Sequence, residues 1–145
     1  MKLLKNFAGG LAGAVALNIL HETVRHLYHD APRVELIGEE AVTKISNAAD
    51  IEPPTGDALY LTTLAGDVLS NAMYYSAIGA VKKKHLLITG LGLGLAAGVG
   101  ALKLTKPIGL SDAPVTRNNT TKALTVAWYT FGGLVAALTI KSLRK

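Results

Sequence analysis

The sequence contains no cysteine among its 145 residues. The chain can therefore form no disulfide bond, thiolate metal centre or cysteine nucleophile. Charge is also missing from one long stretch, because between Leu86 and Leu102 the only polar side chain is that of Thr89. A helix with no charged face at any phase does not fit the surface of a water-soluble helical bundle.

The apolar residues gather in four blocks. The hydrophobic fraction is 50% and the mean hydropathy is +0.33. The blocks cover about residues 6–28, 57–81, 85–103 and 121–141. A membrane-spanning helix needs about 20 mostly apolar residues, and in lipid the backbone must satisfy its own hydrogen bonds. The sequence therefore predicts an all-α integral membrane protein, a four-helix bundle of four transmembrane helices in a single domain that covers residues 1–145.

The segment between the first two blocks has an amphipathic pattern. Over about residues 32–48, apolar side chains recur at helical spacing on the side opposite the acidic ones. We expect an amphipathic helix here. It either lies at the outer membrane interface or docks onto the outer ends of the bundle.

Basic residues predict the orientation. With the N-terminus in the cytoplasm, eight basic residues lie inside and their segments contain no acid. These are Lys2, Lys5, Lys82, Lys83, Lys84, Lys141, Arg144 and Lys145. We expect both termini on the cytoplasmic side of a bacterial inner membrane, with the basic loop 103–122 as the one discordant segment. No aromatic stripe separates the basic residues, so we expect no nucleic-acid binding.

Glycines recur every four residues in two of the blocks. The third block carries Gly90, Gly94 and Gly98 in a glycine-zipper pattern, and the first block carries Gly9 and Gly13. Small residues at this spacing let two helices approach closely. We expect packing within the four-helix unit. The alternative is a homo-oligomer, or a larger membrane complex that is held through the glycine-rich third helix.

Ionisable residues lie at the C-terminal end of the first block. Placing such groups within the hydrocarbon layer of a membrane costs free energy. On one continued helix, Asn18, Glu22, Arg25 and His29 share a stripe. The second block carries a matching stripe of Asp57, Tyr60, Thr63, Asp67, Asn71 and Tyr74. Ionisable groups within a membrane mark a functional site by default. We therefore expect the two stripes to face each other around an outward-facing polar cavity.

The favoured interpretation is a cavity that binds a lipid head group or a small anionic ligand, with or without catalysis. Arg25 would clamp the anion. His26 would titrate as the catalytic group with Glu22 and Asp67 as its carboxylates. The remaining ligand-binding candidates are His29, Asn18, Tyr60 and Asn71. Membrane lipids are the expected partners.

Other interpretations remain open. His21, His26 and His29 are candidate ligands for a divalent metal, although the residues after His21 do not fit the H-E-x-x-H pattern. Alternatively, the charged groups neutralise one another and fix helix register. The chain would then be a non-catalytic structural or assembly subunit of a larger membrane complex. A small transporter is a further alternative.

Overall fold

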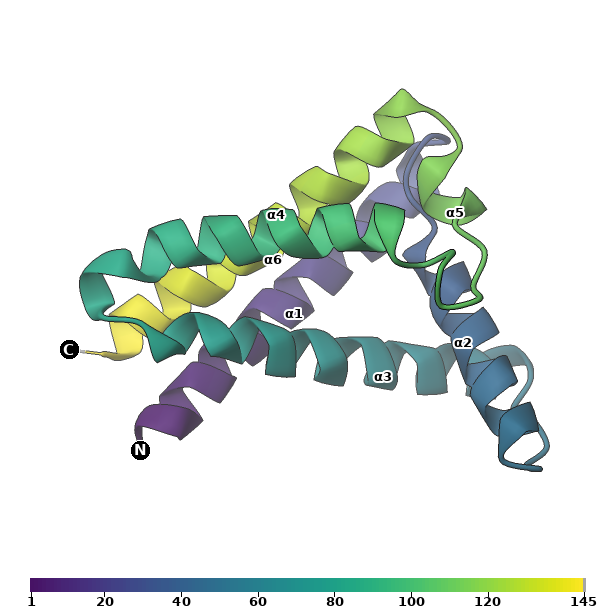
Figure 1. Ribbon diagram of the computed structural model, residues 1–145, viewed down its shortest axis with the longest axis horizontal. Coiled ribbons are helices and arrows are strands. Elements are labelled where there is room, and N and C mark those ends of the chain that lie inside the picture. The colour runs from purple at the N-terminus through teal and green to yellow at the C-terminus, as the bar shows by residue number, and fades with distance from the viewer. Residues whose placement is uncertain (145) are drawn as a thin grey trace.

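The computed structural model describes residues 1–144 and is built from helices (Figure 1). Four helices are long: α1 (Lys2–Leu27), α3 (Gly56–Ser76), α4 (Leu86–Lys103) and α6 (Asn119–Leu143). The shorter elements are α2 (Val34–Ala48), α5 (Ala113–Thr116), η1 (Ala77–Ala80) and η2 (Lys83–His85). No strand occurs over these 144 residues, so the all-α prediction is confirmed.

Three helices are long and apolar enough to cross a membrane: Lys2–Leu27, Lys83–Lys103 and Asn119–Leu143. They support the prediction of an integral membrane protein. The fourth long helix, α3, is not among them. Polar residues along one of its faces, including Asp67 and Asn71, lower its hydropathy.

The long helices pack in the order α3, α1, α6, α4. α1 lies between α3 and α6, and α4 packs on α6 (Figure 1). α3 and α4 share the η1–η2 turn and then diverge, so that they contact each other very little. The result is an open arrangement in which one side of α3 is free to meet α2.

Glycines allow the closest helix contacts. A Cβ atom added to Gly94 would lie 2.6 Å from the Cα of Thr130, and one added to Gly98 would lie 2.6 Å from the Cα of Val126. On α1, a Cβ at Gly10 would lie 2.8 Å from the backbone nitrogen of Ser76 in α3. The glycine faces of α1 and α4 are therefore used for packing within the chain.

Arg144 ties together the end of the molecule where both termini lie (Figure 1). Its guanidinium donates to the carbonyl oxygen of Val81 at 3.0 Å and to Oδ1 of Asn6 at 2.6 Å. It also donates to the carbonyl oxygen of Gly79. These bonds hold the start of α1, the η1–η2 turn and the end of α6 in one place.

At the opposite end, the connector between α1 and α2 is anchored to α5 and the start of α6. Arg117 donates to the carbonyl oxygen of Ala31 at 2.6 Å, and the hydroxyl of Thr121 donates to that of Asp30 at 2.9 Å. The backbone nitrogen of Arg33 donates to the carbonyl oxygen of Pro114 at 3.0 Å. This anchoring fixes the point at which α2 begins and directs α2 across α3.

Candidate functional site

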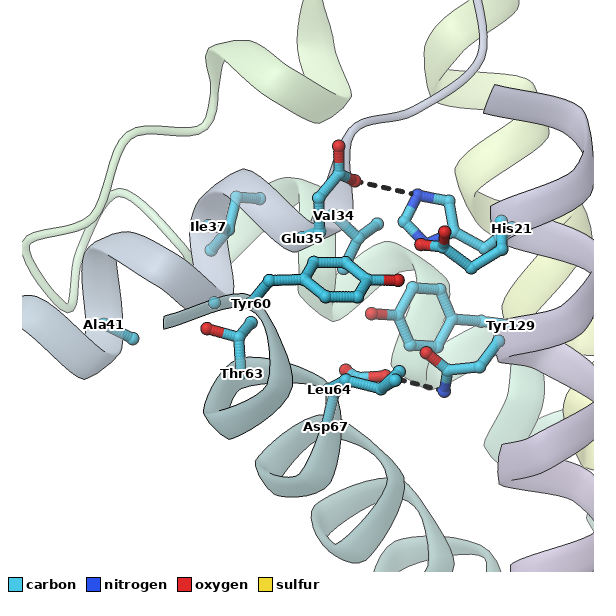
Figure 2. Close-up of a pocket in the computed structure, with 13 residues that line it drawn as sticks. His21, Val34, Glu35, Ile37, Ala41, Tyr60, Thr63, Leu64, Asp67 and Tyr129 are labelled. Carbon is cyan, nitrogen blue, oxygen red and sulfur yellow. Dashed lines mark hydrogen bonds and ion pairs between the residues drawn. The ribbon is translucent and has the colours of Figure 1, made fainter. Parts of the chain in front are cut away.

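A cavity of about 180 Å³ lies where α1, α2 and α3 meet (Figure 2). Its walls carry three carboxylates, one histidine and two tyrosines among apolar side chains. The lining residues are Asn18, His21, Glu22, Val34, Glu35, Ile37, Gly38, Ala41, Tyr60, Thr63, Leu64, Asp67 and Tyr129. The polar stripes of α1 and α3 thus face each other, and α2 supplies a third wall.

Asp67 is held by amide groups alone. Nδ2 of Asn18 donates to its Oδ2 at 2.8 Å, and Nδ2 of Asn71, one turn further along α3, donates to its Oδ1 at 3.0 Å. The ion pairs found over residues 1–144 involve Glu22 and Glu35 in this region but not Asp67. The carboxylate is therefore oriented by two donors but has no cationic partner in contact.

His21 is the histidine of the cavity, with only 6% of its surface exposed. Its Nε2 lies 2.9 Å from the carbonyl oxygen of Pro32 and 3.2 Å from Oε2 of Glu35. Because both neighbours are acceptors, Nε2 carries a proton. In the neutral ring Nδ1 is then the free acceptor. The imidazole ring of His21 also packs on the ring of Trp128, with 5.7 Å between the two ring centroids.

Glu35 joins α2 to α1. Its side chain is only 8% exposed, and it pairs with His21, with Nη1 of Arg25 at 3.5 Å and with Arg33. Burial alone would raise the pKa of Glu35, but the contacts with His21 and Arg33 outweigh it and lower the pKa from 4.5 to about 2. Glu35 is therefore ionised at neutral pH and holds the start of α2 against the cavity.

Arg25 is already engaged by Glu22. Its Nε and Nη2 donate to the two carboxylate oxygens of Glu22, each at 2.9 Å, in a bidentate fork. Its guanidinium carbon also lies 5.9 Å from the ring centroid of Tyr60, which adds a cation–π contact. The guanidinium expected to clamp an anion is thus occupied by an anion of its own helix, and Arg25 does not line the cavity.

His26 and His29 lie away from the cavity. His26 is 66% exposed and approaches Oε2 of Glu22 at 3.8 Å. His29 is not on the predicted stripe, because α1 ends at Leu27 and Tyr28 is extended. Over residues 1–144, no group of three or more histidines and carboxylates is placed to hold a metal ion. The structure thus leaves the two predicted histidine roles without support and brings His21 alone into the cavity.

Sequence reasoning missed two residues that shape the site. Neither Glu35 nor Tyr129 was predicted as a site residue, and both line the cavity. The one sequence feature that could have indicated Glu35 is its position in the first turn of a helix shortly after Pro32, which can return the chain toward the end of α1.

The chain matches no protein-family model, no curated protein and no solved structure.

Proposed function

We propose that the chain is a polytopic protein of a bacterial inner membrane with four spans, whose polar cavity binds the head group of a lipid or a small polar ligand. In this arrangement α3 is the fourth span. Its 21 residues extend about 30 Å at about 1.5 Å per residue, the thickness of the hydrocarbon layer. Asp67, on its polar face, is bonded to Asn18 of α1.

Charge supports an arrangement with both termini inside. The start of α1, the η1–η2 turn and the end of α6 lie at one end of the molecule (Figure 1). This end carries the basic residues near the termini and Lys82–Lys84, as the cytoplasmic side of a membrane protein does. The cavity is at the other end and would open toward the outer side, where α2 lies across its mouth as the proposed interfacial helix.

The observation that carries the proposal is the buried polar cavity itself. Asp67 and the His21–Glu35 pair are costly groups to withdraw from water, particularly at membrane depth. The chain nevertheless places them on the walls of a cavity. A ligand that fills this space and bonds to these groups offsets that cost.

The size of the cavity favours a head group or a small molecule. Sites for drug-sized ligands enclose about 300–1,000 Å³, and this one holds about 180 Å³. A second, open groove of about 360 Å³ runs between α1 and α3 and shares Asn18, Glu22 and Leu64 with the cavity. The rest of this groove is mostly apolar, with Val15, Ile19, Thr23 and Val68. A lipid with its head in the cavity would place an acyl chain there.

One feature favours the second candidate function, a structural or assembly subunit of a larger complex. Glu22 pairs with Arg25, and Glu35 pairs with Arg33, within the chain, as register-fixing ion pairs do. Association through α4 stays a prediction. It would have to use the face opposite Gly94, because that residue packs on α6.

Filling the cavity tests the proposal. Ala41 of α2 lines the cavity and Ala48 of the same helix is exposed. Native mass spectrometry of protein extracted gently from membranes should show a bound lipid or small molecule in the wild type and in Ala48→Phe. The molecule should be absent from Ala41→Phe, with circular dichroism showing unchanged helicity. Equal retention by both variants, or no bound molecule in the wild type, would contradict the proposal.

A further inference from the structure

One carboxyl group of the cavity has no cationic partner. Glu22 is neutralised by Arg25, and Glu35 is neutralised by Arg33 with His21 beside it. Asp67 is the carboxylate left over, since its two contacts come from neutral amides. The proton on Nε2 of His21 is directed at Glu35 and Pro32. A ligand that enters the cavity therefore meets a carboxyl group on α3 that has no cationic partner.

A second, independent feature is an unsatisfied hydroxyl. Thr63 is only 5% exposed, and its Oγ1 has no hydrogen-bond partner. Thr23 and Thr43, by contrast, donate to the carbonyl oxygens four residues earlier at 2.7 and 2.9 Å. Figure 2 shows the Thr63 side chain beneath Tyr60, with its hydroxyl directed toward α2. A buried hydroxyl without a partner costs free energy, and a polar ligand in the cavity can recover it.

Tyrosines complete the lining with groups that suit a cation. The hydroxyls of Tyr60 and Tyr129 both point into the space above Asp67 (Figure 2). Phenolic oxygens accept hydrogen bonds, and tyrosine rings attract cations. An ammonium group brings several N–H donors and a positive charge, which are what Asp67 and the tyrosine hydroxyls lack. A phosphate or carboxylate brings acceptors and a negative charge, neither of which pairs with the carboxyl group of Asp67.

We infer that the ligand of this cavity carries a protonated amine, which pairs with Asp67. The inference rests on the proposed function and names its ligand class. It replaces the anionic ligand expected from the sequence, because the fork of Arg25 is closed by Glu22. The amine comes either from the head group of an aminophospholipid or from a free small amine.

Trp128 provides a reporter for the test. It is the only tryptophan of the chain. Its ring packs on His21, and it lines a small void together with Asn18 and Asp67. Protein in nanodiscs of phosphatidylglycerol, which brings no amine, is titrated with ethanolamine, glycerol, inorganic phosphate or sodium chloride. A parallel series adds phosphatidylethanolamine to the nanodiscs.

Tryptophan fluorescence should change saturably with ethanolamine or with phosphatidylethanolamine. A response to the lipid alone identifies a head group, and a response to ethanolamine alone identifies a free amine. In Asp67→Asn the apparent affinity should fall about tenfold or more. Asp57→Asn, which removes the same charge from the exposed start of α3, should bind as the wild type does. Ala41→Phe, which changes no charge, should also abolish the response.

Other outcomes separate the inference from the proposed function. No response to ethanolamine or to phosphatidylethanolamine, or an equal response to sodium, would contradict the inference that the ligand carries an amine. A response to phosphate alone would also contradict this inference and would favour the anionic ligand expected from the sequence. In each case the proposed function stands if the wild type still retains a molecule that Ala41→Phe loses. If the extracted wild type retains no molecule and no probe is bound, both fail.

Discussion

Asn18 of α1 donates a hydrogen bond to Asp67 of α3 at 2.8 Å, across 49 positions of the sequence. This bond links two of the three helices that meet at the cavity. Replacing Asn18 with Ala leaves Asp67 with Asn71 as its remaining side-chain donor. We expect Asn18→Ala to lower the free energy of unfolding by about 1–3 kcal/mol, the usual cost of a hydrogen-bonded charge that loses a donor.

Reversible unfolding in mixed micelles measures this loss. Asn47→Ala, at an exposed position near the end of α2, is the matched control and should change little. A double-mutant cycle with Asp67→Asn isolates the pair, because the loss from Asn18→Ala should shrink once the carboxylate is gone. Additive losses would show that the two side chains do not interact.

Glu35 makes stability depend on pH. Its pKa is lowered from 4.5 to about 2 in the folded chain, because contacts with His21 and Arg33 outweigh the opposing effect of burial. A lowered folded pKa adds stability that is fully present above the unfolded value of 4.5 and is lost as the pH falls toward 2. The wild type should therefore lose unfolding free energy over this window.

The Glu35→Gln variant should be less stable than the wild type at pH 7 and should lose less stability between pH 4.5 and 2. Unfolding measured at a series of pH values gives, for each protein, the slope of the unfolding free energy against pH. Glu52→Gln, at an exposed position outside the cavity, should keep the wild-type slope. Identical slopes for the wild type and Glu35→Gln would show that Glu35 does not hold α2 in place.

Two neighbouring glycines of α4 should respond oppositely to the same substitution. A Cβ at Gly94 would lie 2.6 Å from the Cα of Thr130, whereas nothing lies within 4 Å of one at Gly92. Gly94→Ala should destabilise the α4–α6 contact by about 1–3 kcal/mol through overpacking. Gly92→Ala should be neutral or stabilising by up to about 1 kcal/mol, because alanine favours the helix. Thermal unfolding of both variants checks the pair, and equal shifts would mean that α4 does not pack on α6 as described.

The all-α fold and two of the three walls of the site were predictable from local pattern. Helical spacing alone places Asn18 and Glu22 on one face and Tyr60, Thr63 and Asp67 on another, and the cost of exposing them to lipid turns the two faces together. The packing order α3, α1, α6, α4 was not predictable in this way. Glycine spacing indicates that helices approach closely but does not identify the partner helix.

The remainder of the site depends on where helices stop. A continuous helix through His29 was expected, but α1 ends at Leu27, and the following turn carries Pro32 and Arg33 back over His21. This turn moves His29 away from the polar stripe of α1 and brings Glu35 of α2 next to His21. Its path is set by bonds to Pro114, Arg117 and Thr121, which are distant in sequence. No local pattern near His21 contains that information.

The absence of cysteine makes the proposed topology directly testable, because any introduced thiol is unique. Single substitutions Lys83→Cys, Glu52→Cys and Ser111→Cys place a thiol in the η2 turn, before α3 and after α4, respectively. If α3 and α4 both cross the membrane, Lys83→Cys should be shielded in intact cells from a membrane-impermeant maleimide. Glu52→Cys and Ser111→Cys should be labelled.

The decisive comparison in this labelling experiment is between the two ends of α3. If α3 lies along the membrane instead of crossing it, Glu52→Cys and Lys83→Cys will react from the same side. Asp67 would then be close to water, and a carboxylate there would cost little. Labelling from opposite sides would instead place Asp67 inside the hydrocarbon layer, where an unpaired carboxylate is costly enough to require either a proton or the amine inferred above.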